Sequence, residues 1–325
     1  MGDLDIINNV QSYQSKIKGF KFVRTLCIIV SVLVVLSAGI FGSPADYDTG
    51  SVILLIAVVG VCFLVLIIMV RLMSKTEKQL KAFIGENITK QILAQFIWLT
   101  GYEPLKYMPE NEMRESGALP SYNQISGSDY VKGTYKGKEV EFCDLKLEYE
   151  ESDTDSDGNT TTSCVTVFQG HLLKIRLGRH LDGGVRVLER RVKRKKKGSS
   201  GLMNSFWSKM GLTPYQDVEM EDEEFNRAFG VKAQNPHTAF YILTPHFMQS
   251  IIRMDGIADA HTNICFLGDY AYISLNNGRD LFEIKSAFEN VESLAAARNR
   301  MYQDMRYITD VMDEILQNEY LFQGQ

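Results

Sequence analysis

Two long apolar stretches without a charged residue constrain the fold of this chain more than any other feature. The first covers residues 25–45 and the second covers residues 49–70. A helix of about 20 residues, rising about 1.5 Å per residue, crosses a hydrocarbon core of about 30 Å. In and around the break between the stretches lie residues typical of turns, namely Gly42, Pro44, Asp46, Asp48 and Gly50. The sequence therefore predicts a transmembrane hairpin over 25–70, with spans of about 25–42 and 51–70.

Basic residues flank both stretches on the side away from the break. They are Lys16, Lys18, Lys21 and Arg24 before the first, and Arg71, Lys75, Lys78 and Lys81 after the second. The break has no Lys or Arg, so the positive-inside rule predicts a multi-pass protein of the cytoplasmic membrane with both termini in the cytoplasm. The competing interpretation treats the first stretch as a cleaved signal peptide and the second as a stop-transfer segment. Both interpretations leave the C-terminal part inside.

The hairpin divides the rest of the chain into segments. Residues 1–24 are expected to form a cytoplasmic amphipathic helix, because apolar residues recur at spacings of four and three: Ile6, Val10, Tyr13, Ile17 and Phe20. This stripe favours packing on another helix over lying on the membrane surface. A juxtamembrane helix with its own apolar stripe is predicted over 71–98. A cytoplasmic α+β domain is predicted over 99–320, followed by a tail at 321–325.

Strand patterns begin after a turn-rich stretch at 100–124. Residues 130–142 are expected to form a β-hairpin that turns at Lys136-Gly137. Further strands are expected to start at Cys143 and Cys164, with a polar loop at 151–163 between them.

The C-terminal part combines helices with another pair of strands. Thr244 is a good N-cap and Pro245 a good first residue for a helix that would bury Phe247. Residues 261–276 are expected to form a hairpin that turns at Gly268-Asp269. A long helix is expected over 285–320, with one apolar face: Leu294, Met301, Met305, Ile308, Met312 and Ile315. The predicted fold class is therefore α+β, with antiparallel hairpins and a long C-terminal helix.

The polar loop contains a fragment of a calcium-binding pattern. Asp153, Asp155 and Asp157, followed by Gly158, match the opening of an EF-hand loop. The twelfth position should be a bidentate Glu and is Cys164 instead. We therefore interpret the loop as a solvated hairpin tip, with a weak cation site as the alternative.

A dense basic run follows the strand region. Its members are Arg190, Arg191, Lys193, Arg194, Lys195, Lys196 and Lys197. Two interpretations stand side by side, a solvated loop and a contact with anionic lipids of the inner leaflet. Both are compatible with a domain already tethered beside the bilayer.

Motifs for catalysis or cofactor binding do not emerge from the sequence. The five histidines never recur at i,i+3 or i,i+4, and a CxxC, a P-loop and a G-x-S-x-G are all missing. Cys143 and Cys164 could face each other across a hairpin, but a cytoplasmic domain favours free thiols. The net charge of -5 comes from mixed signs and does not indicate nucleic acid binding. We expect no cofactor and no catalytic residues.

One part of the chain resembles a known family. The acidic stretch EDEEF at 221–225, then Phe229, then YILTP at 241–245 followed by a helix, resemble the bacterial membrane-protein family catalogued as domain of unknown function 3137. Upstream, FQGHLLKIRL from Phe168 resembles its paired strands around an FxG turn. The resemblance implies two spans and a cytoplasmic mixed domain without an established activity. It also gives a faint hint of a LemA-type membrane protein as partner.

Taken together, these patterns predict an integral membrane protein that presents a cytoplasmic module. The module is expected to bind a protein partner or the membrane surface, and the lipid bilayer is the other expected partner. A ligand- or ion-sensing domain is the first alternative, and a hydrolase with a dispersed site is the second.

Overall fold

A computed structural model describes residues 2–41, 49–154, 160–190, 215–282 and 291–322 of the chain. The chain forms two compact units. The first, here called the helical unit, comprises Met1–Asn87 and Ile284–Ala297. The second, the sheet unit, comprises Ile88–Glu283 and Arg298–Gln325.

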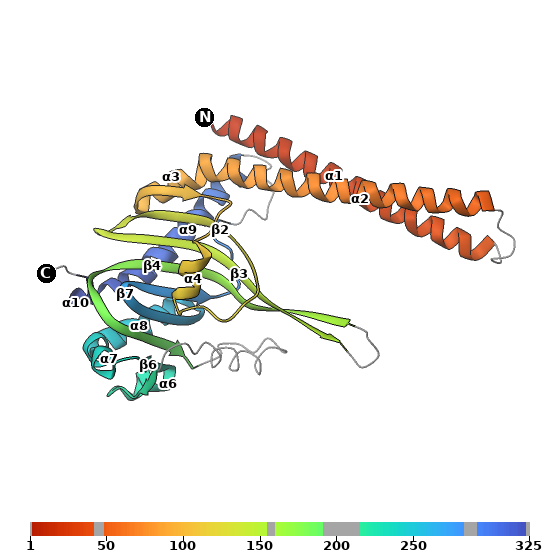
Figure 1. Cartoon of the computed structure of the whole chain (residues 1–325). Coiled ribbons are helices and arrows are strands. Elements are labelled where there is room, and N and C mark those ends of the chain that lie inside the picture. Colours follow the sequence, from red (N-terminus) through yellow and green to blue (C-terminus); the bar gives the residue numbers. More distant parts are fainter. Residues whose placement is uncertain (1, 42–48, 155–159, 191–214, 283–290, 323–325) are drawn as a thin grey trace. The chain divides into compact units, whose positions relative to one another are not determined.

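Two long antiparallel helices, α1 (Asp3–Phe41) and α2 (Thr49–Ile84), lie side by side in the helical unit (Figure 1). The rings of Tyr13 and Phe83 pack with their centroids 6.0 Å apart. Val10 and Ile17, one turn to either side of Tyr13, are buried. The prediction that this apolar stripe packs on another helix is therefore confirmed.

The apolar segments of both helices are uncovered. On α1, Leu33 is 59% exposed, and on α2 Phe63 is 65% exposed. Among the residues whose placement is described, one helix, Ile56–Phe96, is long and apolar enough to cross a membrane, by length and composition. Residues 42–48, which hold most of the predicted turn between the spans, lie outside the described part of the chain.

A mixed α+β arrangement makes up the sheet unit. Its described strands are β1 (Trp98–Glu103), β2 (Gln124–Tyr135), β3 (Lys138–Thr154), β4 (Thr160–Glu189), β5 (Gln216–Val218), β6 (Phe229–Ala233) and β7 (His261–Asn276). A π-helical turn, η1 (Gly85–Thr89), joins α2 to α3 (Lys90–Phe96). The other described helices are α4 (Glu110–Glu115), α6 (Glu223–Ala228), α7 (Pro236–Ile242), α8 (Pro245–Ala258), α9 (Val291–Leu316) and α10 (Glu319–Phe322).

The strands form one antiparallel sheet in the order β1-β2-β3-β4-β6-β5, and β7 pairs with β4. The hairpin predicted at 130–142 is confirmed, because Tyr135 pairs with Lys138. Lys136 and Gly137 both have positive φ, as a two-residue turn of type I′ requires. In the view of Figure 1, α9 lies behind the sheet and α4 in front of it.

The predicted hairpin at 261–276 is wrong. These residues form the single strand β7, whose two halves both pair with the long strand β4. Gly268 has a φ of 58° and pairs with Leu181, at the point where the β4–β7 register shifts. The glycine therefore provides an irregularity within the strand instead of a chain reversal.

The turn expected at the FxG sequence is also wrong, because Phe168 and Gly170 lie within β4. A Cβ atom on Gly170 would lie 1.9 Å from the carbonyl oxygen of Leu275 in β7. The glycine therefore permits two strands to approach closely and does not mark a turn.

Two other expectations for the sheet need correction. The stretch 100–124 contains strand and helix (β1 and α4), because β1 gains its hydrogen bonds from the distant β2. Beyond the sheet, β3 and β4 continue as a ribbon (Figure 1), so the expected polar loop is strand at both ends. Cys143 pairs with Leu172 and Cys164 with Glu150, so the two cysteines do not face each other. Both are free thiols.

The helical predictions for the C-terminal part are confirmed where they depend on local signals. Thr244 caps α8 by accepting a hydrogen bond from the Phe247 N–H at 3.4 Å. The predicted apolar face of α9 is buried throughout: Leu294, Met301, Met305, Ile308, Met312 and Ile315. Within the sheet unit, Phe96 packs on Tyr302 with ring centroids 4.6 Å apart. At its C-terminal end, the apolar stripe of the predicted juxtamembrane helix (71–98) therefore packs against α9 through Phe96.

Candidate functional site

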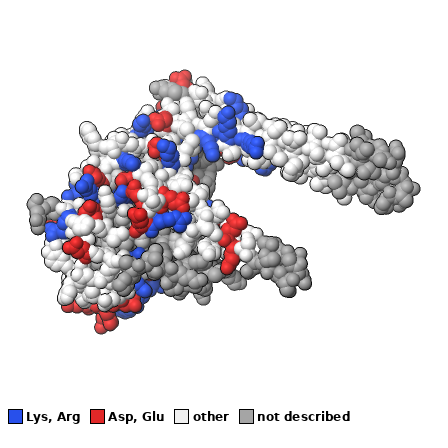
Figure 2. All heavy atoms as spheres, in the orientation of Figure 1, with Lys and Arg blue, Asp and Glu red and all other residues white. Residues whose placement is uncertain are grey.

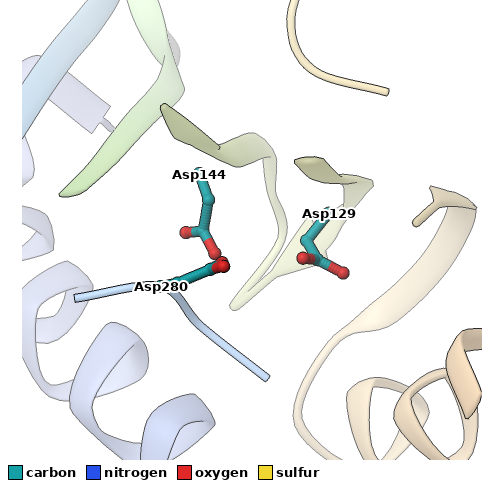
Figure 3. Close-up of side chains that lie close together, drawn as sticks. All are labelled: Asp129, Asp144 and Asp280. Atoms are coloured by element: carbon teal, nitrogen blue, oxygen red, sulfur yellow. The ribbon is translucent and has the colours of Figure 1, made fainter. Parts of the chain in front are cut away.

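Three aspartates from separate parts of the sheet unit converge on one point (Figure 3). Asp129 comes from β2, Asp144 from β3, and Asp280 from the segment that follows β7. One carboxylate oxygen of each lies within 4.8 Å of the corresponding oxygens of the other two. We call this group the carboxylate cluster.

A bulge in β2 positions Asp129. The β2–β3 register shifts between Ser128 and Val131, and Asp129 adopts a φ of 56°. Its N–H donates to the Pro104 carbonyl at 3.2 Å, and the Tyr102 hydroxyl donates to its Oδ1 at 2.7 Å. Burial, followed by the nearby Asp129 carboxylate, raises the pKa of Tyr102 well above its usual range, so the tyrosine stays a donor. Asp129 is 1% exposed to solvent. The bulge thus directs this carboxylate into the interior of the sheet unit.

Asp144 is held by two donors. The His171 Nδ1 lies 2.6 Å from its Oδ1, and the backbone N–H of Leu281 donates to its Oδ2 at 2.5 Å. Asp144 and His171 are cross-strand partners in β3 and β4, so the sheet register itself brings them together. The Leu281 bond also links Asp144 to the segment that carries Asp280.

His171 is neutral. The Asn277 amide nitrogen lies 3.2 Å from both His171 Nε2 and the Tyr307 hydroxyl, which itself donates to the Ala258 carbonyl at 3.1 Å. This network assigns the Nδ1–H of His171 as the donor to Asp144 and leaves Nε2 as an acceptor. Burial lowers the pKa of His171 to about 3, in agreement with that assignment. His171 therefore orients Asp144 without supplying positive charge.

Asp280 completes the cluster from a short, tightly turned segment. The Arg279 N–H donates to Asn277 Oδ1 at 3.0 Å, and Phe282 has a φ of 57°. Asp280 is partly exposed, but its Oδ1 is buried and has no hydrogen-bond partner within the described part of the chain. This oxygen is thus available to a ligand inside the cluster.

The chemistry of the cluster suits a hard cation. Carboxylates that lie this close repel each other when all are ionised, and burial strengthens the repulsion. Either a shared proton or a bound cation relieves it. The donors are oxygen atoms, which Mg²⁺ and Ca²⁺ prefer, and the cluster brings no sulfur or imidazole ligand that would favour zinc.

The site residues predicted from sequence lie elsewhere. Asp153 is in the β3 part of the protruding ribbon, opposite Thr161, while Asp155 and Asp157 fall outside the described residues. Of the basic run, Arg190 is exposed and its N–H donates to the Ala228 carbonyl at 2.7 Å. Residues 191–197 are outside the described part of the chain. The structure therefore tests neither the calcium loop nor the basic run.

Sequence inspection missed the carboxylate cluster because its members come from three distant segments. One signal was present, since Asp144 lies among apolar neighbours in the strand sequence FCDLKL. A charged residue on a buried strand needs a partner, and His171 occupies a similar apolar setting in GHLLKI. Pairing the two required the strand register, which a single sequence does not provide.

Comparisons with known proteins found similarity over part of the chain. None of the curated proteins matches it. The crystal structure of the mycobacterial trehalose monomycolate transport factor A, TtfA, is similar with a TM-score of 0.33 and 8% sequence identity, covering 71% of this chain and 96% of that one. The family model described as "Protein of unknown function (DUF3137)" matches residues 166–316. Through this segment, the chain is similar to the DUF3137 family.

Proposed function

We propose that this chain is an integral membrane protein whose two helices, α1 and α2, both span the bilayer and present the sheet unit in the cytoplasm as a binding module. The observation that carries the proposal is the uncovered apolar surface of both helices. Exposed apolar side chains in their described segments include Leu26, Ile29, Val32, Leu33, Leu36, Ile56, Val61, Phe63, Leu64 and Ile68. Water disfavours such a surface by about 25 cal/mol per Å² of apolar area, whereas lipid tails accommodate it.

The orientation follows from the flanking charges. Basic residues border the apolar segments only at the ends away from residues 42–48. The positive-inside rule then favours a cytoplasmic sheet unit and a short external connection. On this side of the membrane, the module has access to the inner leaflet and to cytoplasmic proteins. The basic run Arg190–Lys197 fits a contact with anionic lipids there.

Cysteine labelling tests the topology. Cys164 is exposed and serves as the reporter of the sheet unit, whereas Cys265 is fully buried, and burial raises its pKa to about 11. In a background with Cys27→Ala and Cys62→Ala, a Ser43→Cys variant should react with an impermeant maleimide in intact cells. Cys164 should react only after lysis.

The matched control carries Cys164→Ser and should lose the lysis-dependent signal. Labelling of Cys164 in sealed cells, or protection of position 43, would contradict the proposed arrangement. Release of the protein from membranes by alkaline carbonate would exclude the spans themselves.

Divalent-cation binding is a second candidate function, favoured by the geometry of the carboxylate cluster. It corresponds to an ion-sensing domain. Asp129 and Asp144 are 1% and 4% exposed, and they lie next to Asp280, so a cation would neutralise the negative charge that the three carboxylates bring together. A bound ion would also fix the segment after β7 to β2 and β3.

Thermal unfolding of the detergent-solubilised full chain tests cation binding. After EDTA treatment, Ca²⁺ or Mg²⁺ at about 100 times its Kd should stabilise the protein by about 2.7 kcal/mol, which raises Tm by several degrees. An Asp280→Asn variant should lose most of this shift, because it removes one of the three negative charges that attract the cation, at a partly exposed position. The matched control is Asp217→Asn, on a carboxylate 87% exposed in β5. Equal shifts in both variants would exclude the cluster as the site.

A further inference from the structure

The helical unit carries basic residues at matching levels on its two helices. Contact between Tyr13 and Phe83 fixes the register of α1 against α2. Because the helices are antiparallel and rise equally per residue, each step forward along α1 corresponds to a step back along α2. In this register, basic residues of the two helices lie at the same height along the helix pair: Lys18 with Lys78, Lys21 with Lys75, and Arg24 with Arg71. We call these six residues the basic collar.

Among the described residues, carboxylates do not pair with the collar. None of its six members forms an ion pair with another residue that the structure describes. All except Arg24 are exposed, and the buried Nε of Arg24 has no hydrogen-bond partner in the described part of the chain. Glu77 is the single acidic residue within 16–24 and 71–81. Within the part of the chain that the structure describes, the collar is therefore a concentration of positive charge that is not paired with carboxylates.

The collar adjoins the apolar surface on both helices at the same level. Arg24 directly precedes the first apolar stretch, and Arg71 directly follows the second. Figure 2 shows Lys and Arg gathered on the helix pair beside a long stretch without charged side chains. If the apolar stretches occupy the hydrocarbon core, the collar lies at the depth of the lipid phosphates. This step depends on the proposed membrane anchoring.

The chemistry of the collar selects one class of lipid. Residues three apart on a helix are separated by about 4.5 Å along its axis, so the three levels span only about 10 Å. Guanidinium and ammonium groups at this spacing match phosphate oxygens, and arginine binds them in a bidentate way. A zwitterionic headgroup adds its own cation to the cluster, whereas an anionic headgroup brings net negative charge.

We propose that the basic collar binds the phosphate groups of anionic phospholipids and thereby retains a shell of acidic lipid around the helix pair. The interaction differs from the contact suggested for Arg190–Lys197, which belongs to another segment. The collar is part of the spanning helices, so its lipids would stay bound whatever the sheet unit does.

Lipid retention by the purified full chain tests the proposal. Native mass spectrometry would count phosphatidylglycerol and phosphatidylcholine, of equal acyl chains, bound to the detergent-solubilised protein. The wild-type protein should retain at least about ten times more phosphatidylglycerol than phosphatidylcholine. Each basic residue near an anionic surface contributes roughly a fivefold change in affinity. A variant with Gln at all six collar positions should lose this preference.

A matched control removes six basic residues of similar exposure from the sheet unit by substitution with Gln: Lys106, Lys132, Lys136, Lys146, Arg176 and Lys232. This control should keep the preference, and so should a conservative variant with Lys18, Lys21, Lys75 and Lys78 changed to Arg. Equal retention of both lipids by wild type would overturn the proposal, as would a collar variant that keeps its preference or a control that loses it.

Failure of the collar proposal can be distinguished from failure of the proposed membrane anchoring. Alkaline carbonate and maleimide labelling report whether the helices span the bilayer, and lipid retention reports the collar. A protein that resists carbonate extraction but binds both lipids equally would retain the proposed anchoring and lose the collar.

Discussion

At the scale of single residues, the structure depends on a polar network inside the sheet unit that contains a neutral histidine. His171 is fully buried and hydrogen-bonded on both ring nitrogens. An unsatisfied buried polar group costs about 1–3 kcal/mol, so each member of the network depends on the others. The network fixes both the orientation of Asp144 and the segment that carries Asp280.

The neutral state of His171 makes stability dependent on pH. Burial lowers its folded pKa to about 3, below the usual value of 6.5, so the unfolded chain binds the proton more readily. The contribution to stability is fully present above about pH 6.5 and is lost as pH falls towards the folded pKa, with a slope of up to about 1.4 kcal/mol per pH unit.

Melting curves at pH 7.5 and 5 would measure this dependence. A His171→Gln variant should have a lower melting temperature than wild type at pH 7.5. Its melting temperature should also fall less than that of wild type between pH 7.5 and pH 5. His237→Gln, at an exposed position on α7, is the matched control and should behave like wild type. A wild-type protein as stable at pH 5 as at pH 7.5 would contradict the neutral histidine.

At the scale of elements, the close approach of β4 and β7 decides how the sheet is built. These strands pair on both sides of the irregularity at Gly268, and Gly170 lies against the Leu275 carbonyl. A Gly170→Ala substitution would place a Cβ against a backbone oxygen, which cannot move without opening the strand pair. The expected loss is several kcal/mol or failure to fold.

Two other glycines provide matched controls. Gly137 has a φ of 79° but open space around it, so Gly137→Ala should cost only the backbone strain, about 1 kcal/mol. Gly101 meets its nearest neighbour, the Lys132 Cβ, at an ordinary 3.8 Å, so Gly101→Ala should be nearly neutral. Melting temperatures should fall in the order Gly101→Ala, Gly137→Ala, Gly170→Ala. A tolerated Gly170→Ala would show that the strands can separate there.

At the scale of the whole molecule, local signals in the sequence predicted several features that the structure contains. The stripe of α1, the turn at Lys136-Gly137, the Thr244 cap and the apolar face of α9 all depend on residues within a few turns of each other. Such features are determined by periodicity and backbone preference, and a single sequence records both.

Long-range pairing explains the errors. Residues 261–276 alternate and contain a glycine with an aspartate, which is the local pattern of a hairpin. Their continuous pairing with β4 overrides that preference. The carboxylate cluster was invisible for the same reason, because Asp129, Asp144 and Asp280 meet only through the sheet register and a bulge.

The central position of β4 also has a consequence for the chain during its synthesis. β4 receives its hydrogen bonds from β3 on one side, and from β6 and β7, which are translated much later. A ribosome-bound chain that ends before β7 therefore exposes a long unpaired strand edge, which is a template for aggregation. The helices α1 and α2 emerge well before this stage. Under the proposed membrane anchoring, early capture of these helices by the bilayer would keep nascent chains apart until β7 closes that edge.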